Sequence, residues 1–100
     1  MDTIFALASA SGKAGVSVVR ISGNGAFEVV SKITGNLPQV RYATLRKLYD
    51  LSGCKIDHGL VVCFKGPKSF TGEDVVELHL HGSPAVVASV LRILGGFDAL

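Results

Sequence analysis

Hydrophobic and polar residues alternate most regularly over residues 73–81, which predicts a β-strand with one buried side and one polar side. The apolar residues that share one face are Val76, Leu78 and Leu80. The polar residues that share the opposite face are Glu77, His79 and His81. Residues 82–84 are Gly-Ser-Pro, which favour a turn, a helix N-cap and a first helical position. The pattern therefore predicts a strand that leads directly into a helix.

The rest of the chain divides into similar short segments. Apolar runs predict four further strands, at residues 3–8, 16–21, 41–49 and 56–64. Apolar residues at helical spacing predict two helices, at residues 26–34 and 84–94. The second strand is apolar on both faces except for Arg20, so we expect it inside the sheet, with a partner or a cleft near that charge. The strand at residues 41–49 mixes aromatic and basic residues and is expected at an edge of the sheet.

This order of elements predicts an α+β domain in which two or three helices pack on a mixed sheet of about five strands. The chain has 100 residues, 48% of them hydrophobic, which fits one domain. A chain of this length buries only about 65% of its unfolded surface, so its apolar content predicts that another subunit or domain covers part of it. The longest apolar run, residues 60–64, is much shorter than the roughly 20 residues that cross a bilayer, and we expect no membrane partner.

Charge and cysteine content narrow the possible functions. The formal net charge of +2 is too small to indicate a nucleic-acid-binding protein, which usually carries a clustered basic face. Cys54 and Cys63 match no zinc or redox spacing and are expected to be reduced. The first residues lack the basic segment of a secretory signal, which predicts a cytoplasmic protein, or an organelle counterpart without its presequence.

Nucleotide, metal and hydrolase sites are not favoured. Backbone N–H groups of residues 11–15 could cradle an anion, but Gly12-Lys13 is followed by Ala14, where a P-loop needs Ser or Thr, so a tight turn is favoured. Glu77 and His81 would be roughly 13 Å apart on a regular strand, too far for both to bind one zinc ion together with His79. No Gly-x-Ser-x-Gly elbow is present, and we predict no catalytic residue and no metal ligand.

Arg20 and Glu77 are the two residues whose chemistry the core does not explain. If their strands lie close together, they could form a salt bridge. Alternatively they could hold a polar ligand, because a carboxylate accepts two parallel N–H bonds and a guanidinium binds an anionic or carbonyl oxygen. Pterins and guanines both present such a donor edge. The residue chemistry leaves the choice open.

Three motifs resemble those of the tRNA uridine-modification GTPases, the MnmE (TrmE) family. Residues 69–84 resemble the signature S-F-T-G-E-D-V-x-E-x-x-x-H-G-G-P. Residues 2–23 are similar to the family opening D-T-I…P-G-x-G-G-V…R-I-S-G, and residues 37–43 fit L-P-x-x-R-Y-A. Three residues depart from these patterns: Ser11 replaces a proline, and Ala14 and Ser83 replace glycines.

The resemblance implies that residues 1–100 are an N-terminal domain, truncated at its C-terminal end, with a fold similar to the tetrahydrofolate-binding domain of the glycine-cleavage T-protein. In the family this domain forms homodimers and binds 5-formyl- or 5,10-methylene-tetrahydrofolate as a one-carbon donor. The matching folate contacts are Arg20 and Glu77. A further family contact, a lysine, is expected beyond Leu100. The family gives no certain role to His79 or His81.

By the same resemblance, the parent enzyme would work with an FAD- and NADH-using partner, MnmG, to modify the wobble uridine of certain tRNAs. Its GTPase domain, with GTP, magnesium and potassium, and its catalytic cysteine would lie outside this chain, which alone would not be an enzyme. One alternative is a purely structural dimerisation domain. Another, ranked lowest, is direct tRNA binding through four basic residues: Arg41, Arg46, Lys47 and Lys55.

Overall fold

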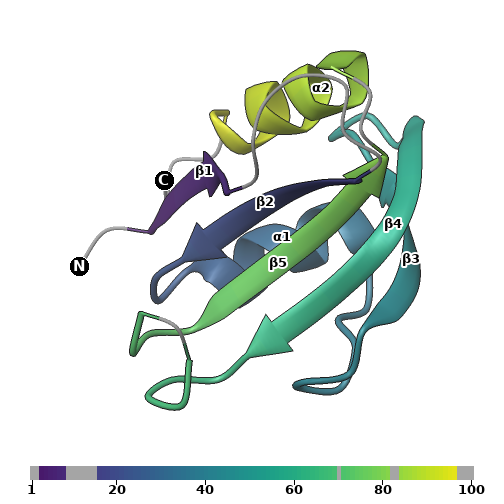
Figure 1. Ribbon diagram of the computed structural model, residues 1–100. Helices are drawn as coiled ribbons and strands as arrows, with labels where there is room; N and C mark the ends of the chain where they lie inside the picture. The colour runs from purple at the N-terminus through teal and green to yellow at the C-terminus, as the bar shows by residue number, and fades with distance from the viewer. Residues whose placement is uncertain (1–2, 9–15, 70, 82–83, 97–100) are drawn as a thin grey trace.

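The computed structural model describes residues 3–8, 16–69, 71–81 and 84–96. Its elements are β1 (Ile4–Leu7), β2 (Val16–Ser22), α1 (Ala26–Thr34), β3 (Thr44–Tyr49), β4 (Lys55–Phe64), β5 (Val75–His81) and α2 (Pro84–Leu94). The five strands form one sheet in the order β1-β2-β5-β4-β3, with α1 and α2 packed against it (Figure 1). The α+β class is confirmed, as are the interior place of β2 and the edge place of β3.

The sheet is antiparallel, which corrects the prediction of a mixed sheet. All four neighbouring pairs among the described strands are antiparallel. β2 ends at Ser22, opposite Val75 at the start of β5. Residues 35–43 carry the chain from α1 back toward this same end, where β3 begins with Thr44 opposite Val61. Because β3 starts near the end at which β2 stops, the helical connection between them does not make the two strands parallel.

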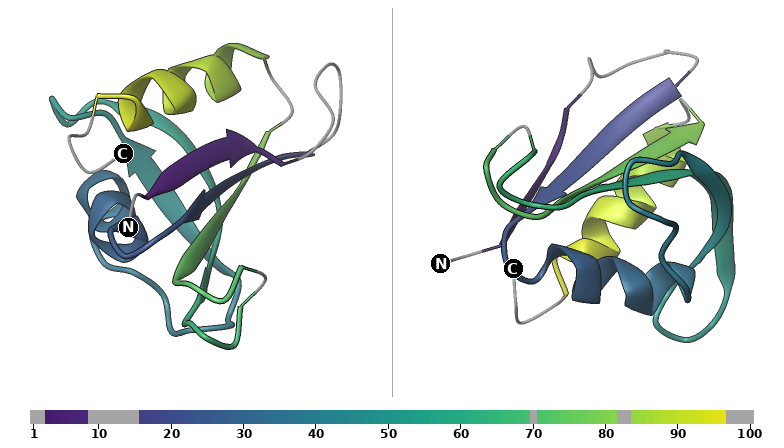
Figure 2. Two further views of the ribbon diagram at one scale, coloured as in Figure 1. Left: turned by 90° about the vertical axis from the view of Figure 1, so that its left-hand side faces the viewer. Right: turned by 90° about the horizontal axis from the view of Figure 1, so that it is seen from below.

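Both helices cover one face of the sheet, as Figure 2 shows from two directions. α1 packs on β3 and β5, and α2 packs on β1, β4 and β5. The strand residues buried in the core beneath them are Val19, Ile21, Leu48, Val61, Cys63, Val76, Leu78 and Leu80. The helices contribute Val29, Val30, Ile33, Val90 and Leu94, among others. The predicted alternation of β5 is confirmed, because the apolar face points into this core.

The other face of the sheet has no helix over it among the described residues. Several large apolar side chains on this open face are exposed: Ile4, Val16, Leu45 and Leu60. The polar face of β5 lies on the same side, since its residues alternate with the buried ones. The open face therefore combines exposed apolar groups with the charged and histidine side chains that the sequence singled out.

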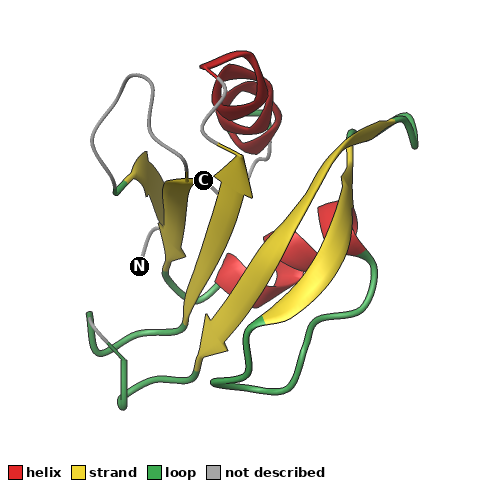
Figure 3. Cartoon of the chain, turned by 45° about the vertical axis from the view of Figure 1, so that its right-hand side comes forward, coloured by secondary structure: helices red, strands yellow, loops and turns green. Residues whose placement is uncertain are grey.

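β4 and β5 separate before either strand ends, as Figure 3 shows. Their pairing runs from Leu60 opposite His79 to Phe64 opposite Val75, and the earlier residues of β4 pair with β3 alone. Gly59 lies at the point of separation, where a Cβ atom would come within 2.4 Å of the carbonyl oxygen of His79. Only glycine permits so close an approach. The separation opens a hollow between the two strands on the open face.

Candidate functional site

Arg20 and Glu77 form an ion pair on the open face. They lie directly opposite each other in the register of β2 and β5. The guanidinium Nη2 and Nε of Arg20 both donate to Oε2 of Glu77, at 2.7 and 3.1 Å. The side chains are 30% and 18% exposed, so the pair is reachable from solvent. The expected partner of Arg20 is thus Glu77, and of the two alternatives considered for this pair the structure shows the salt bridge.

His79 extends this pair into a row of three polar groups. It follows Glu77 by two residues on the same face of β5, and its Nε2 lies 3.2 Å from Oε1 of the carboxylate. An ionised carboxylate only accepts hydrogen bonds, so Nε2 carries the proton of this contact. Burial by itself raises the pKa of Glu77, but the hydrogen bonds from Arg20 and His79 outweigh it and lower that pKa below its ordinary value of 4.5. The carboxylate is therefore held in its charged form.

A hollow of about 220 Å³ adjoins the Arg20 end of the row. Its walls are mostly apolar and come from β1, while Arg20, Ser22 and Thr71 supply polar atoms. Ser22 and Thr71 are hydrogen-bonded through their hydroxyl groups at 2.7 Å, which joins the loop before β5 to the end of β2. A flat ring in this hollow would meet apolar walls and a guanidinium.

The loop that carries Thr71 is fixed by Asp74. Its carboxylate accepts the backbone N–H of Gly66 at 3.1 Å and pairs with Nζ of Lys65 at 3.4 Å. Its carbonyl oxygen accepts the N–H of Gly23 at 2.9 Å, just after β2. The signature segment around residues 69–84 therefore shapes the rim of the hollow as well as supplying Glu77. Phe70, Gly82 and Ser83 of this segment lie outside the described residues.

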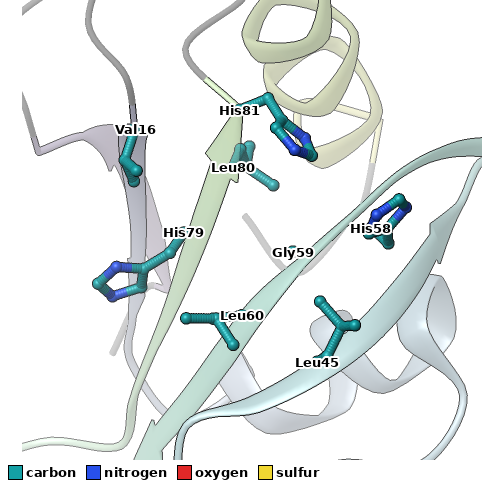
Figure 4. A pocket seen from close by; sticks show the side chains of 8 residues that line it. All are labelled: Val16, Leu45, His58, Gly59, Leu60, His79, Leu80 and His81. Atoms are coloured by element: carbon teal, nitrogen blue, oxygen red, sulfur yellow. The ribbon is translucent and has the colours of Figure 1, made fainter.

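A second hollow, of about 370 Å³, lies at the other end of the row, where β4 and β5 separate. It contains three histidines among apolar side chains: His58, His79 and His81 (Figure 4). Figure 4 shows the ring of His79 turned toward β2, away from the other two. The described residues include no group of three or more His, Cys, Asp or Glu side chains arranged to hold a metal ion.

Asp57 and His81 bridge the gap between the separated strands. Nδ1 of His81 lies 2.9 and 3.0 Å from the two carboxylate oxygens of Asp57. The ring of His58 meets that of His81 edge-on, with centroids 5.6 Å apart. Burial by itself raises the pKa of Asp57, but hydrogen bonds from His81 and from the backbone N–H of His58 lower it below its ordinary value of 3.8. Both histidines at the end of β5 are therefore hydrogen-bonded to carboxylates.

The structure does not gather the four basic residues considered for tRNA. Arg46 and Lys47 are consecutive on β3 and so face opposite sides of the sheet. Arg41 donates to the carbonyl oxygen of Lys68 and lies over the ring of Phe64, near the start of β3. Lys55 pairs opposite Tyr49 at the far end of the same hairpin.

The last candidates from the sequence are the loop at residues 11–15 and the two cysteines. The loop at residues 11–15, predicted as a tight turn, lies outside the described residues. Cys54 is exposed and Cys63 is buried, and neither forms a disulfide. Burial raises the pKa of the Cys63 thiol above its ordinary value of 9.0. Within the described part of the chain, no helix is long and apolar enough to cross a membrane.

Sequence reasoning missed two contacts of the site. The contact of His79 with Glu77 had a signal in the alternation of β5, because residues two apart on a strand share a face. The contact of His81 with Asp57 had none, because it depends on where β4 leaves β5. Both contacts attach a histidine that lines the second hollow to a carboxylate.

Comparison with known proteins adds a family to this geometry. The family described as the N-terminus of the GTP-binding protein TrmE matches residues 3–98. The tRNA modification GTPase MnmE of Dinoroseobacter shibae is 52% identical over 100 residues, which cover 100% of this chain and 23% of that protein. MnmE of Roseobacter denitrificans is 55% identical over 98 residues, covering 98% of this chain and 23% of that protein.

A eukaryotic relative is similar to the same extent. The mitochondrial 5-taurinomethyluridine-[tRNA] synthase subunit GTPB3 of Danio rerio is 48% identical over 100 residues. The match covers 99% of this chain and 20% of that protein. The chain thus spans less than a quarter of the length of these curated relatives.

Proposed function

The chain belongs to the family of TrmE N-terminal domains, and from this premise we propose that it is the folate-binding and homodimerising domain of a cytoplasmic tRNA modification GTPase. Relatives at about half identity over the whole chain are named tRNA modification GTPases, which supports the role in tRNA modification. GTP, magnesium and potassium are assigned to a GTPase domain outside residues 1–100. The wobble-uridine modification itself would require the FAD-dependent MnmG partner.

The observation that carries the folate assignment is the Arg20–Glu77 pair beside an apolar hollow. A pterin ring presents an amino group next to a ring N–H, and a carboxylate can accept both. The guanidinium suits a carbonyl or carboxylate oxygen of the same ligand. Apolar walls from β1 would cover the flat ring. This chain would thus bind and orient the folate, which supplies the one-carbon unit when bound.

The open face supports the homodimer. Ile4, Val16, Leu45 and Leu60 are exposed there, in a chain of only 100 residues. Exposed apolar groups on one side of a sheet are typical of a surface that another subunit covers. The hollow at Arg20 lies on this same face, so a second subunit would approach the proposed folate site.

One alternative is favoured by a specific observation. Arg20 and Glu77 already neutralise each other within the chain at 2.7 Å. A purely structural dimerisation domain would need no more than this ion pair. Sedimentation that shows a dimer, together with no folate binding by the intact protein, would favour this alternative.

Calorimetric titration of the intact protein with 5-formyltetrahydrofolate tests the proposal. Replacing Arg20 or Glu77 by Ala should weaken binding about 10- to 100-fold, because each removes charge-assisted hydrogen bonds. Arg92→Ala on α2 and Glu28→Ala on α1 are matched controls, since both side chains are exposed on helices of the opposite layer. Unchanged affinity in Arg20→Ala and Glu77→Ala would overturn the folate assignment.

A further inference from the structure

Glu77 is nearly saturated as a hydrogen-bond acceptor. A carboxylate offers about four acceptor positions, two on each oxygen. Oε2 accepts both Nη2 and Nε of Arg20, and Oε1 lies against Nε2 of His79. Among the described residues, one position on Oε1 therefore remains.

A ligand edge with two parallel N–H donors needs one position on each carboxylate oxygen. On Oε2 both positions are taken by Arg20. At least one of these hydrogen bonds must therefore be given up when such a ligand binds. The guanidinium can then turn toward an oxygen of the ligand, but it no longer holds the carboxylate plane as firmly as before.

The contact that stays is the one from His79. It reaches Oε1, whereas the two hydrogen bonds from Arg20 reach Oε2, and it comes from the same strand as Glu77. Because the two residues are neighbours on one face of β5, the ligand does not need to displace this hydrogen bond. This hydrogen bond therefore still restrains the orientation of the carboxylate when Arg20 turns toward a ligand.

We propose that His79 is a positioning residue of the folate site: its Nε2–H holds Oε1 of Glu77 so that the carboxylate keeps one orientation when Arg20 engages the ligand. This inference rests on the proposed folate-binding function. It assigns to His79 a role that acts through Glu77, without contact to the ligand. It also explains why a histidine stands beside the carboxylate, turned away from His58 and His81 (Figure 4).

The test is calorimetric titration of the intact protein with 5-formyltetrahydrofolate in a graded series of variants. His79→Leu removes the donor and should weaken binding about 10-fold, the size expected for a hydrogen bond to a charged group. His79→Gln keeps an N–H donor of similar reach and should stay within about 3-fold of the wild type. His58→Leu, in the same hollow but without contact to Glu77, is the matched control and should bind like the wild type.

A double-mutant cycle separates positioning from a general structural role. In the Glu77→Ala background, His79→Leu should cause no further loss, because its partner is absent. A merely structural role would weaken binding in both backgrounds and would lower the melting temperature. If His79→Leu proves unstable, His79→Asn replaces it: this polar side chain is too short to reach Oε1 and should also bind about 10-fold more weakly.

The outcomes distinguish the two proposals. A wild-type protein that binds no folate overturns both the proposed function and the role of His79. Folate binding by the wild type with unchanged affinity in His79→Leu overturns the role of His79 alone. Equal losses in the Leu and Gln variants would also overturn it, since a donor would then not be what matters.

Discussion

The two faces of the sheet use the same strands for different purposes. On β5, Leu78 is fully buried under the helices. Its neighbour Glu77 lies on the open face, where its carboxylate is hydrogen-bonded to the side chains of Arg20 and His79. On β4, Val61 is buried and its neighbour Leu60 is exposed. The covered face is almost uniformly apolar and secures the fold. The open face carries charges, histidines and exposed apolar groups that lie outside this core.

The charged row of the open face is only partly buried, which limits what it costs the stability of the domain. Removing one partner of a fully buried ion pair would cost several kcal/mol, roughly 3–5. The Arg20–Glu77 pair is only partly buried, so its side chains keep access to water and to a ligand. Substitutions on the two faces should therefore have separable effects: stability on one, binding on the other.

The largest effect is expected on the covered face. Leu78→Ala should lower the free energy of unfolding by about 2–5 kcal/mol, because it leaves a cavity at the centre of the core. Folate affinity of the molecules that remain folded should change little, although Glu77 is the adjacent residue. Urea denaturation gives the first quantity and titration the second. A loss below about 1 kcal/mol would mean that the two faces are not separable in this way.

An intermediate effect is expected for the exposed apolar groups. Leu45→Glu should change the free energy of unfolding of the monomer by no more than about 0.5 kcal/mol, because the side chain is 59% exposed. The same variant should weaken the dimer, since it places a charge in the proposed interface. Leu51→Glu is the control: Leu51 is 62% exposed, but lies in the hairpin loop instead of the open face. Sedimentation at several concentrations measures the dimer dissociation constant of each variant. Equal dissociation constants for Leu45→Glu and Leu51→Glu would contradict the placement of the interface.

The two faces also differ in how far the sequence could predict them. Alternation and helical spacing placed all seven elements, because burial of one side is a local pattern. The antiparallel arrangement was not predicted, since it depends on residues 35–43 returning the chain to the end where β2 stops. The similarity in fold to the glycine-cleavage T-protein stays a prediction.

The open face was predictable in its residues but not in its contacts. Arg20 and Glu77 stood out as charges on otherwise apolar strands, yet their pairing follows from the register of β2 against β5, which no local pattern sets. The Asp57–His81 bridge requires the separation of β4 from β5 at Gly59. The local sequence pattern thus identified the residues of the open face, but it could not predict contacts between strands that are far apart in the chain.

The smallest expected effect concerns that bridge and its dependence on pH. The pKa of Asp57 lies below its ordinary value of 3.8 in the folded chain, so the bridge adds stability that is fully present above that value. The stability is lost as the pH falls below 3.8 through the folded pKa, because the unfolded chain takes up the proton first. Asp57→Asn should therefore remove part of the decrease in the free energy of unfolding at acid pH.

Urea denaturation at about pH 5 and about pH 3 measures this prediction. The wild type should lose more stability than Asp57→Asn between the two conditions, by less than about 1 kcal/mol because His81 is largely exposed. Glu28→Gln is the matched control, since the Glu28 side chain is 75% exposed on α1, outside the open face. An identical acid dependence in the wild type and Asp57→Asn would mean that the separated strands are joined without help from this charge.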